Sequence, residues 1–178
     1  MSKHLRIHVS CPDDRGLLAS VASRIFDLGG DLGDASFALL GEQAEMTCVA
    51  SFPENVTEDQ LRDALCTLSA VQKGGEVTVK PFRLGRAHVS NGTATHVVRV
   101  HGVDRPGLMA RLAECFGELG ANIVRMDAEH AERELGTDYK MRFEVHIPSE
   151  RVEACLANVS NTAEAMGLHF HAEEAETG

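Results

Sequence analysis

The sequence has few aromatic side chains and little positive charge. It contains no tryptophan and one tyrosine, and aromatic residues make up 4% of its 178 residues. Proteins that bind single-stranded nucleic acid stack the bases on such rings, so this kind of binding is disfavoured. A formal net charge of −10 also opposes direct contact with phosphate backbones. We therefore expect any role in nucleic-acid regulation to act through another protein.

Long apolar runs and paired cysteines are missing as well. No stretch reaches the roughly 20 apolar residues that a membrane span needs, and the N-terminal residues lack the apolar segment of a signal peptide. The five cysteines include no Cys-x-x-Cys pair. We expect free thiols and a cytoplasmic protein.

The sequence also lacks the usual patterns of enzymes and metal sites. It has no Gly-x-Ser-x-Gly, phosphate-binding loop or dinucleotide fingerprint. Strand alternation would place His169 and His171 on one sheet face, but a zinc site needs further converging ligands. We expect no catalytic residues, no cofactor and no metal.

An internal repeat is the main feature that the sequence does contain. Residues 13–17 (DDRGL) precede a helical pattern that ends at 27–32 (DLGGDL). Residues 104–108 (DRPGL) precede a similar pattern that ends at 118–123 (ELGANI), and the two glycines Gly16 and Gly107 are 91 positions apart. The repeat predicts two modules. We place them at 1–86 and 95–178, the second with an acidic C-terminal tail, and place a turn-rich linker at 87–94.

Hydrophobic periodicity gives both halves the order strand, helix, strand, strand, helix, strand. The second helix of the first half is expected to open with a capping box of Thr57 and Gln60. In the second half, residues 130–138 are predicted to form a long hairpin loop. This order is that of the ferredoxin-like α+β fold, in which a four-stranded antiparallel sheet carries two helices on one face.

The repeated motif resembles that of the ACT domain, a small amino-acid-sensing regulatory module. The second repeat carries it in full, from Asp104-Arg105-Pro106-Gly107-Leu108 to Gly120, Asn122 and Ile123. The first repeat has Arg15 in place of the proline and Asp31 in place of the asparagine. A tandem pair of ACT-type modules of this length is similar to the glycine cleavage system transcriptional repressor family.

The motif also has a physical rationale as a ligand loop. A glycine at 107 lets a ligand approach the backbone closely, and the unpartnered first amides of the following helix favour a carboxylate. Asn122 is expected beside the same loop, where its amide would bond the ligand. Asp104 has two interpretations, as a contact for an ammonium group or as a plain helix cap. The candidate ligand-binding residues are Asp104, Arg105, Gly107, Leu108, Asn122 and Ile123, with Asp13, Gly16, Leu17, Asp31 and Leu32 in the first repeat.

Together, these features predict a non-enzymatic regulatory protein that senses a small amino acid, glycine or a close relative. The resemblance implies that the ligand lies between two modules, that the chain forms a homodimer, and that its partner is a protein such as a DNA-binding transcriptional activator. Since the Asp31 carboxylate would repel that of an amino acid, we expect the two repeats to be functionally unequal. The alternative is a dimerisation or protein-interaction platform that binds no ligand.

Overall fold

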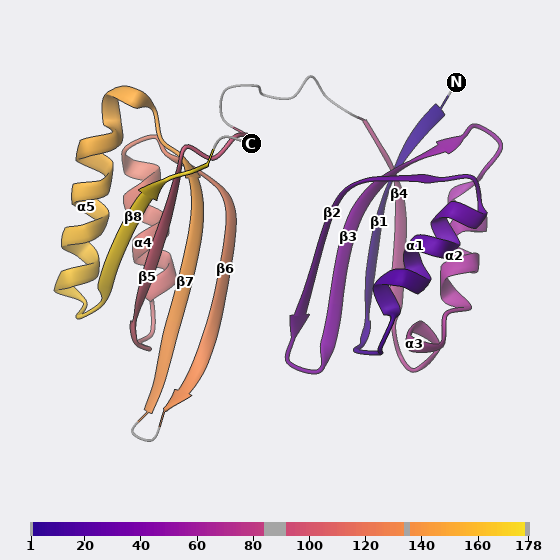
Figure 1. Ribbon diagram of the computed structural model, residues 1–178, viewed down its shortest axis with the longest axis horizontal. Coiled ribbons are helices and arrows are strands. Elements are labelled where there is room, and N and C mark those ends of the chain that lie inside the picture. Colours follow the sequence, from indigo (N-terminus) through magenta and orange to yellow (C-terminus); the bar gives the residue numbers. More distant parts are fainter. Residues whose placement is uncertain (1, 84–91, 134–135, 177–178) are drawn as a thin grey trace. The chain divides into compact units, whose positions relative to one another are not determined.

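The computed structural model describes residues 2–83, 92–133 and 136–176. The chain divides into two compact units, residues 1–85 and 86–178 (Figure 1). Most of the predicted linker at 87–94 lies outside the described residues.

The first unit is an antiparallel sheet with its helices on one face (Figure 1). The strand order is β2-β3-β1-β4. The elements, in chain order, are β1 (Ser2–Pro12), α1 (Leu17–Asp27), β2 (Asp31–Leu40), β3 (Gln43–Pro53), α2 (Glu58–Cys66), α3 (Ser69–Gln72) and β4 (Glu76–Phe82).

Strand alternation produces the core of this unit. Leu5, Ile7 and Val9 of β1 are buried against the helices, on the same face as Val21 of α1 and Leu61 of α2. The residues between them point to the other side of the sheet, which carries no helix and is called the open face below. The predicted capping box at the start of α2 is confirmed by reciprocal hydrogen bonds between Thr57 and Gln60.

The second unit repeats this architecture with the strand order β6-β7-β5-β8. Phe116 of α4 and Phe143 of β7 lie at the centre of its core, with their ring centroids 5.4 Å apart. The elements are β5 (His96–Val103), α4 (Leu108–Glu118), β6 (Asn122–Arg133), β7 (Gly136–His146), a 3-10 turn (Ser149–Arg151), α5 (Val152–Ala165) and β8 (His169–Glu174). The predicted α+β fold of two tandem βαββαβ modules is confirmed.

One local prediction is wrong, and one element was not predicted. The segment 130–138 is no long loop, because β6 continues to Arg133 and β7 begins at Gly136, with backbone pairing through both. The first unit also contains the four-residue helix α3, which the hydrophobic pattern did not reveal. The β6–β7 extension depends on backbone hydrogen bonds, whereas the short α3 buries Ala70 and Val71 in the core.

None of the described helices is long and apolar enough to cross a membrane. All five cysteines are free thiols, and Cys66 is exposed whereas the other four are buried. Burial raises the pKa of the Cys48 thiol to about 11, so its reactive thiolate form is scarce at neutral pH.

We predict that only Cys66 reacts rapidly with a thiol reagent such as DTNB in the native protein. The buried thiols need local unfolding before the reagent reaches them. Stopped-flow absorbance should show one rapidly reacting thiol per wild-type chain, and none in the Cys66→Ser variant. In denaturant, all five thiols of the wild-type chain should react. A second fast equivalent in native protein would contradict the burial of the other four.

Candidate functional site

The candidate loop of the second repeat joins β5 to α4. Gly107 is the N-cap of α4, with φ of 88°, and no side chain caps the helix. A Cβ on Gly107 would have no atom within 4 Å inside the described structure. Its positive φ, rather than a crowded backbone, is therefore why this unit needs glycine here. The first turn of α4 presents uncapped amides at the surface.

Asp104 is held by a side chain that the sequence motif does not include. Its Oδ2 lies 3.1 Å from Nε2 of His130 on β6. The His130 ring in turn stacks on Tyr139 of β7, with centroids 4.5 Å apart. The interpretation of Asp104 as a helix cap is wrong. The N-cap residue is Gly107, and the Asp104 side chain contacts His130 instead. Asp104 is instead fixed beside the far end of β6.

Asn122 does not lie beside this loop within its own unit, and that expectation is wrong. Asn122 pairs with His146, next to the start of β5, whereas the loop follows the end of β5. The 11 residues of α4 separate the two positions, which corresponds to about 16 Å of helix. One unit by itself therefore cannot bring the loop and Asn122 to the same small ligand.

The apolar members of the predicted set serve the core. Leu108 is 1% exposed and Leu17 is 5% exposed, while Ile123 and Leu32 are partly buried and pack against the two cores. Arg105, Gly107 and Asn122 are exposed. The side chains that remain available to a ligand are therefore the polar ones.

The first repeat positions its loop differently. Gly16 has φ of 79° and is the N-cap of α1. Asp13 is exposed, and its amide donates to the carbonyl of Glu42. The next residue, Asp14, accepts a hydrogen bond from Lys73 Nζ at 3.0 Å. This bond and the lysine charge hold the pKa of Asp14 below its usual range.

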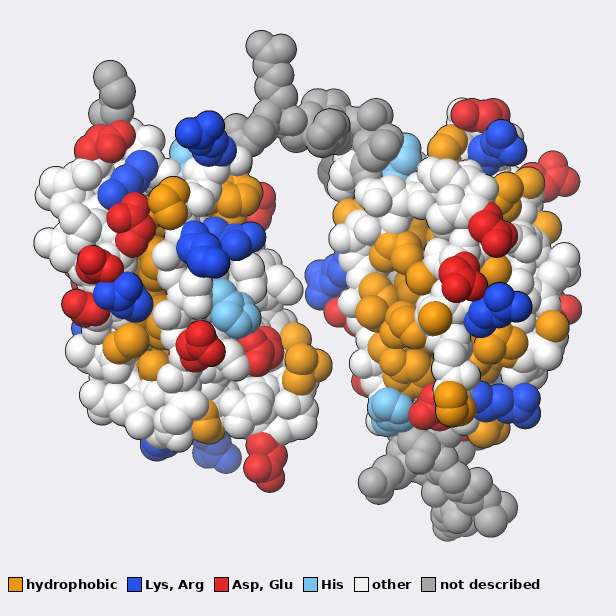
Figure 2. Space-filling view, turned by 180° about the vertical axis from the view of Figure 1, so that it is seen from behind, with side chains coloured by type: hydrophobic (Ala, Val, Ile, Leu, Met, Phe, Trp, Pro, Cys, Tyr) orange, Lys and Arg blue, Asp and Glu red, His pale blue; other side chains and the backbone are white. Residues whose placement is uncertain are grey.

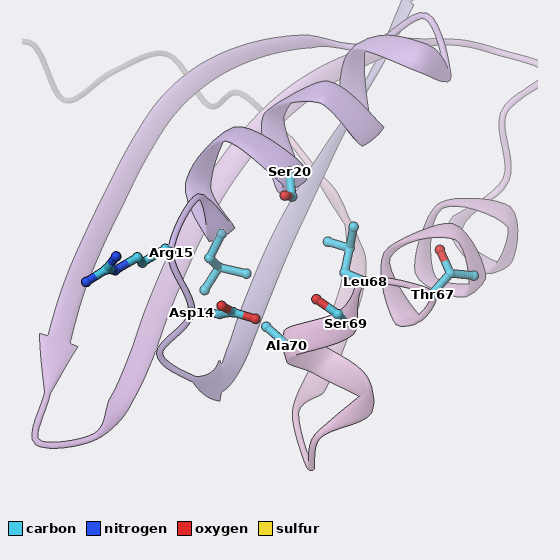
Figure 3. A pocket seen from close by; sticks show the side chains of 8 residues that line it. Asp14, Arg15, Ser20, Thr67, Leu68, Ser69 and Ala70 are labelled. Carbon is cyan, nitrogen blue, oxygen red and sulfur yellow. The ribbon is translucent and has the colours of Figure 1, made fainter.

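A small cavity of about 170 Å³ lies between this loop and the segment that leads into α3. Figure 3 shows Asp14 and Ser69 pointing toward each other across it, while Arg15 points away. Asp31 is not part of the lining. Asp31 pairs with Ser51 at the opposite end of the sheet from the loop. Asn122 has the corresponding position in the second unit.

The sequence analysis missed His130, Tyr139, Lys73 and Ser69 as neighbours of the two loops. Each comes from a different element than its loop, and Lys73 is 59 residues from Asp14. No spacing rule connects such positions, because the fold alone brings them together.

Within the described residues, no group of three or more His, Cys, Asp or Glu side chains is placed to hold a metal ion. His169 and His171 do share one face of β8, and His169 stacks on His101 at 4.8 Å. Cys11 is buried, and burial together with nearby carboxylates raises the pKa of its thiol.

Comparison with known proteins finds a family match within the second unit. The ACT domain family model matches residues 96–153. A solved structure of a protein of unknown function from Galdieria sulphuraria has a TM-score of 0.78 and 18% identity, covering 99% of this chain and 100% of that one. A proposed glycine cleavage system transcriptional repressor has a TM-score of 0.64 and 13% identity, with 99% of each chain covered. At these identities the two structures establish the tandem fold alone. No curated protein matches the sequence.

We predict that Gly107→Ala lowers the free energy of unfolding by about 1 kcal/mol, because alanine is strained at positive φ. Gly117→Ala in the same helix is the matched control. Both glycines have open space around the missing Cβ, but only Gly107 has a positive φ. Gly117→Ala should stabilise by up to about 1 kcal/mol in urea unfolding. Equal effects of the two changes would show that φ is not the determinant.

We also predict that Lys73→Met raises the pKa of Asp14 toward its usual range. In the wild type the lowered pKa makes this contact stabilising above the unfolded-state pKa, and the contribution disappears as the pH falls through the folded-state pKa. A carboxyl ¹³C NMR titration measures the shift. Lys80→Met, which removes a lysine on the open face, is the control and should leave the Asp14 titration unchanged.

Proposed function

We propose that this chain, whose second unit carries an ACT domain, is a non-catalytic regulatory protein that binds a small amino acid and transmits its presence to a protein partner. ACT domains are amino-acid-binding regulatory modules, and the match covers the loop at Asp104–Leu108. The observation that carries the proposal is the polar loop that begins α4, fixed in place by His130.

The chemistry of this loop suits both charged groups of an amino acid. The uncapped amides and the positive end of the α4 dipole attract the carboxylate. Asp104 supplies a negative charge for the ammonium group. Since His130 contacts Oδ2 of Asp104, the other oxygen, Oδ1, is the atom that we expect to meet the ligand. The glycine at 107 leaves the approach open.

A complete site that includes Asn122 requires two modules, because the loop and Asn122 lie at opposite ends of α4. β6 is an edge strand of its sheet. Antiparallel alignment of β6 with the β6 of a second copy would put one Asn122 beside the loop of the other copy, since Asp104 contacts the far end of β6 through His130. We therefore propose a homodimer with two equivalent ligand sites.

Exposed apolar side chains support this choice of surface. Val124 and Met126 of β6 are 39% and 42% exposed, and Figure 2 shows hydrophobic side chains gathered on the visible face of the second unit. Burying such side chains in a dimer is favourable by about 25 cal/mol per Å² of apolar area.

A ligand that binds across this interface stabilises the dimer and shifts the population toward it. The partner would then recognise one of the two states. The net charge of −10 favours a basic partner such as a DNA-binding activator over nucleic acid itself, and free thiols agree with a cytoplasmic protein.

A thermal-shift screen of the twenty amino acids tests the proposal. We expect glycine or a close relative to raise the melting temperature, because a ligand at a hundredfold excess over its Kd stabilises by about 2.7 kcal/mol. Asn122→Ala and Gly107→Ala should each abolish the shift, whereas Gly117→Ala should keep it. If no amino acid stabilises the wild type, the chain is a ligand-free interaction platform.

Mixing the two inactive variants tests whether the site is shared between copies. In an Asn122→Ala and Gly107→Ala heterodimer, one site contains both substitutions and the other contains neither. Random exchange should therefore restore about a quarter of the wild-type sites in calorimetry, for an isologous dimer. No restoration after exchange would place both groups in one chain.

A further inference from the structure

The open face of the first sheet contains a hollow of about 310 Å³ lined by Arg6, His8, Thr47 and Thr78. These four residues come from three adjacent strands, because His8 pairs with Thr47 of β3 on one side and with Thr78 of β4 on the other. Arg6, two residues before His8, pairs with Lys80 of β4. Two cationic side chains and two hydroxyl groups therefore share one patch, called the Arg6 hollow below.

The two cations of the Arg6 hollow have no acidic partner. Within the described part of the chain, neither Arg6 nor Lys80 forms an ion pair or a side-chain hydrogen bond. Glu45 is an acidic side chain that contacts the lining. It accepts a hydrogen bond from Ser10 at 2.6 Å and lies 3.4 Å from His8 Nε2. Glu45 therefore contacts Ser10 and His8, and it forms no ion pair with Arg6 or Lys80.

On the open face of the second sheet, carboxylate side chains pair with the basic residues. Arg99 lies beside Glu173 of β8 at 2.6 Å, and His171 lies 3.6 Å from the same carboxylate. The bond from Arg99 holds the pKa of Glu173 below its usual range. The other basic residues of this face, Arg125, Lys140 and Arg142, also pair with carboxylates.

The repeats differ at one decisive register position. In the second sheet Glu173 lies opposite Val97, and in the first sheet Lys80 lies opposite Arg6, the residue that corresponds to Val97 at the 91-residue offset. The place of a carboxylate in one repeat is taken by a lysine in the other. At this register position the first sheet therefore lacks the carboxylate that pairs with a basic side chain in its counterpart.

We propose that the Arg6 hollow binds a small dianion of the phosphate class, either inorganic phosphate or a phosphate monoester. A guanidinium donates two parallel hydrogen bonds to two phosphate oxygens, an ammonium adds a point charge, and threonine hydroxyls donate to the remaining oxygen. Arg6 and Lys80 together supply two positively charged groups for such an anion. This site is separate from the amino-acid loop and does not depend on it.

Figure 2 shows Lys, Arg and His side chains with Asp and Glu side chains among them on the visible face of the first unit. In a chain with a net charge of −10, two basic side chains without ion pairs give the anion a local attraction that opposes the repulsion by the whole molecule.

Titration of the ¹⁵N-labelled full chain with inorganic phosphate, at constant ionic strength and pH 7.5, tests the proposal. We expect saturable shifts of the amides and side chains of Arg6, His8, Thr47 and Thr78. Arg6→Gln and Lys80→Gln should each weaken binding about tenfold, the effect of one charge-assisted hydrogen bond. If the hollow also accepts phosphate monoesters, phosphoserine should compete with inorganic phosphate and produce shifts of the same residues. If it does not, only inorganic phosphate should produce them.

Arg99→Gln is the matched control, because Arg99 occupies the open face of the second sheet but is already paired with Glu173. It should leave the phosphate affinity unchanged. The proposal is overturned if the shifts are linear with concentration, if they fall on the first turns of α1 or α4 instead, or if Arg6→Gln binds phosphate as the wild type does. Circular dichroism of Arg6→Gln verifies that the exposed substitution leaves the fold intact.

Discussion

The orientation of the first helix in each βαββαβ module is the constraint on which the candidate site depends. α4 returns along β5, so the loop that precedes the helix and the strand that follows it lie at opposite ends of the sheet. The motif consists of one group of residues before the helix and a second group after it. The whole length of the helix separates these two groups in space. A ligand that needs both ends therefore makes assembly of two modules a condition of binding, which couples recognition to association.

Much of the fold could be predicted from the sequence because its signals are local. The alternation of Leu5, Ile7 and Val9 identifies a strand with one buried face, and Thr57 with Gln60 marks a helix start through side-chain bonds three residues apart. The continuation of β6 to Arg133 was not predictable in this way. That segment is extended by backbone pairing with β7, and backbone pairing leaves no trace in hydrophobic periodicity.

The candidate site could be predicted only in part. The glycines that begin α1 and α4 follow from the motif, since both have positive φ. The groups that fix the loops do not follow from it. His130 holds Asp104 from β6, and Lys73 holds Asp14 from the end of α3, so the two repeats secure corresponding loops from different sides. Such contacts are tertiary, and a duplicated motif does not imply that they are duplicated.

The open faces of the two sheets extend this argument from the loops to the surface. Substitutions at core positions are limited by packing, because a change of even one methylene is costly in a close-packed interior. Exposed strand positions carry no such limit, so Lys80 and Glu173 have opposite charges at the same register position without altering the fold. A change of sign there alters which ligands the face attracts. The repeat architecture thus keeps the two sheets alike while their open faces differ in charge.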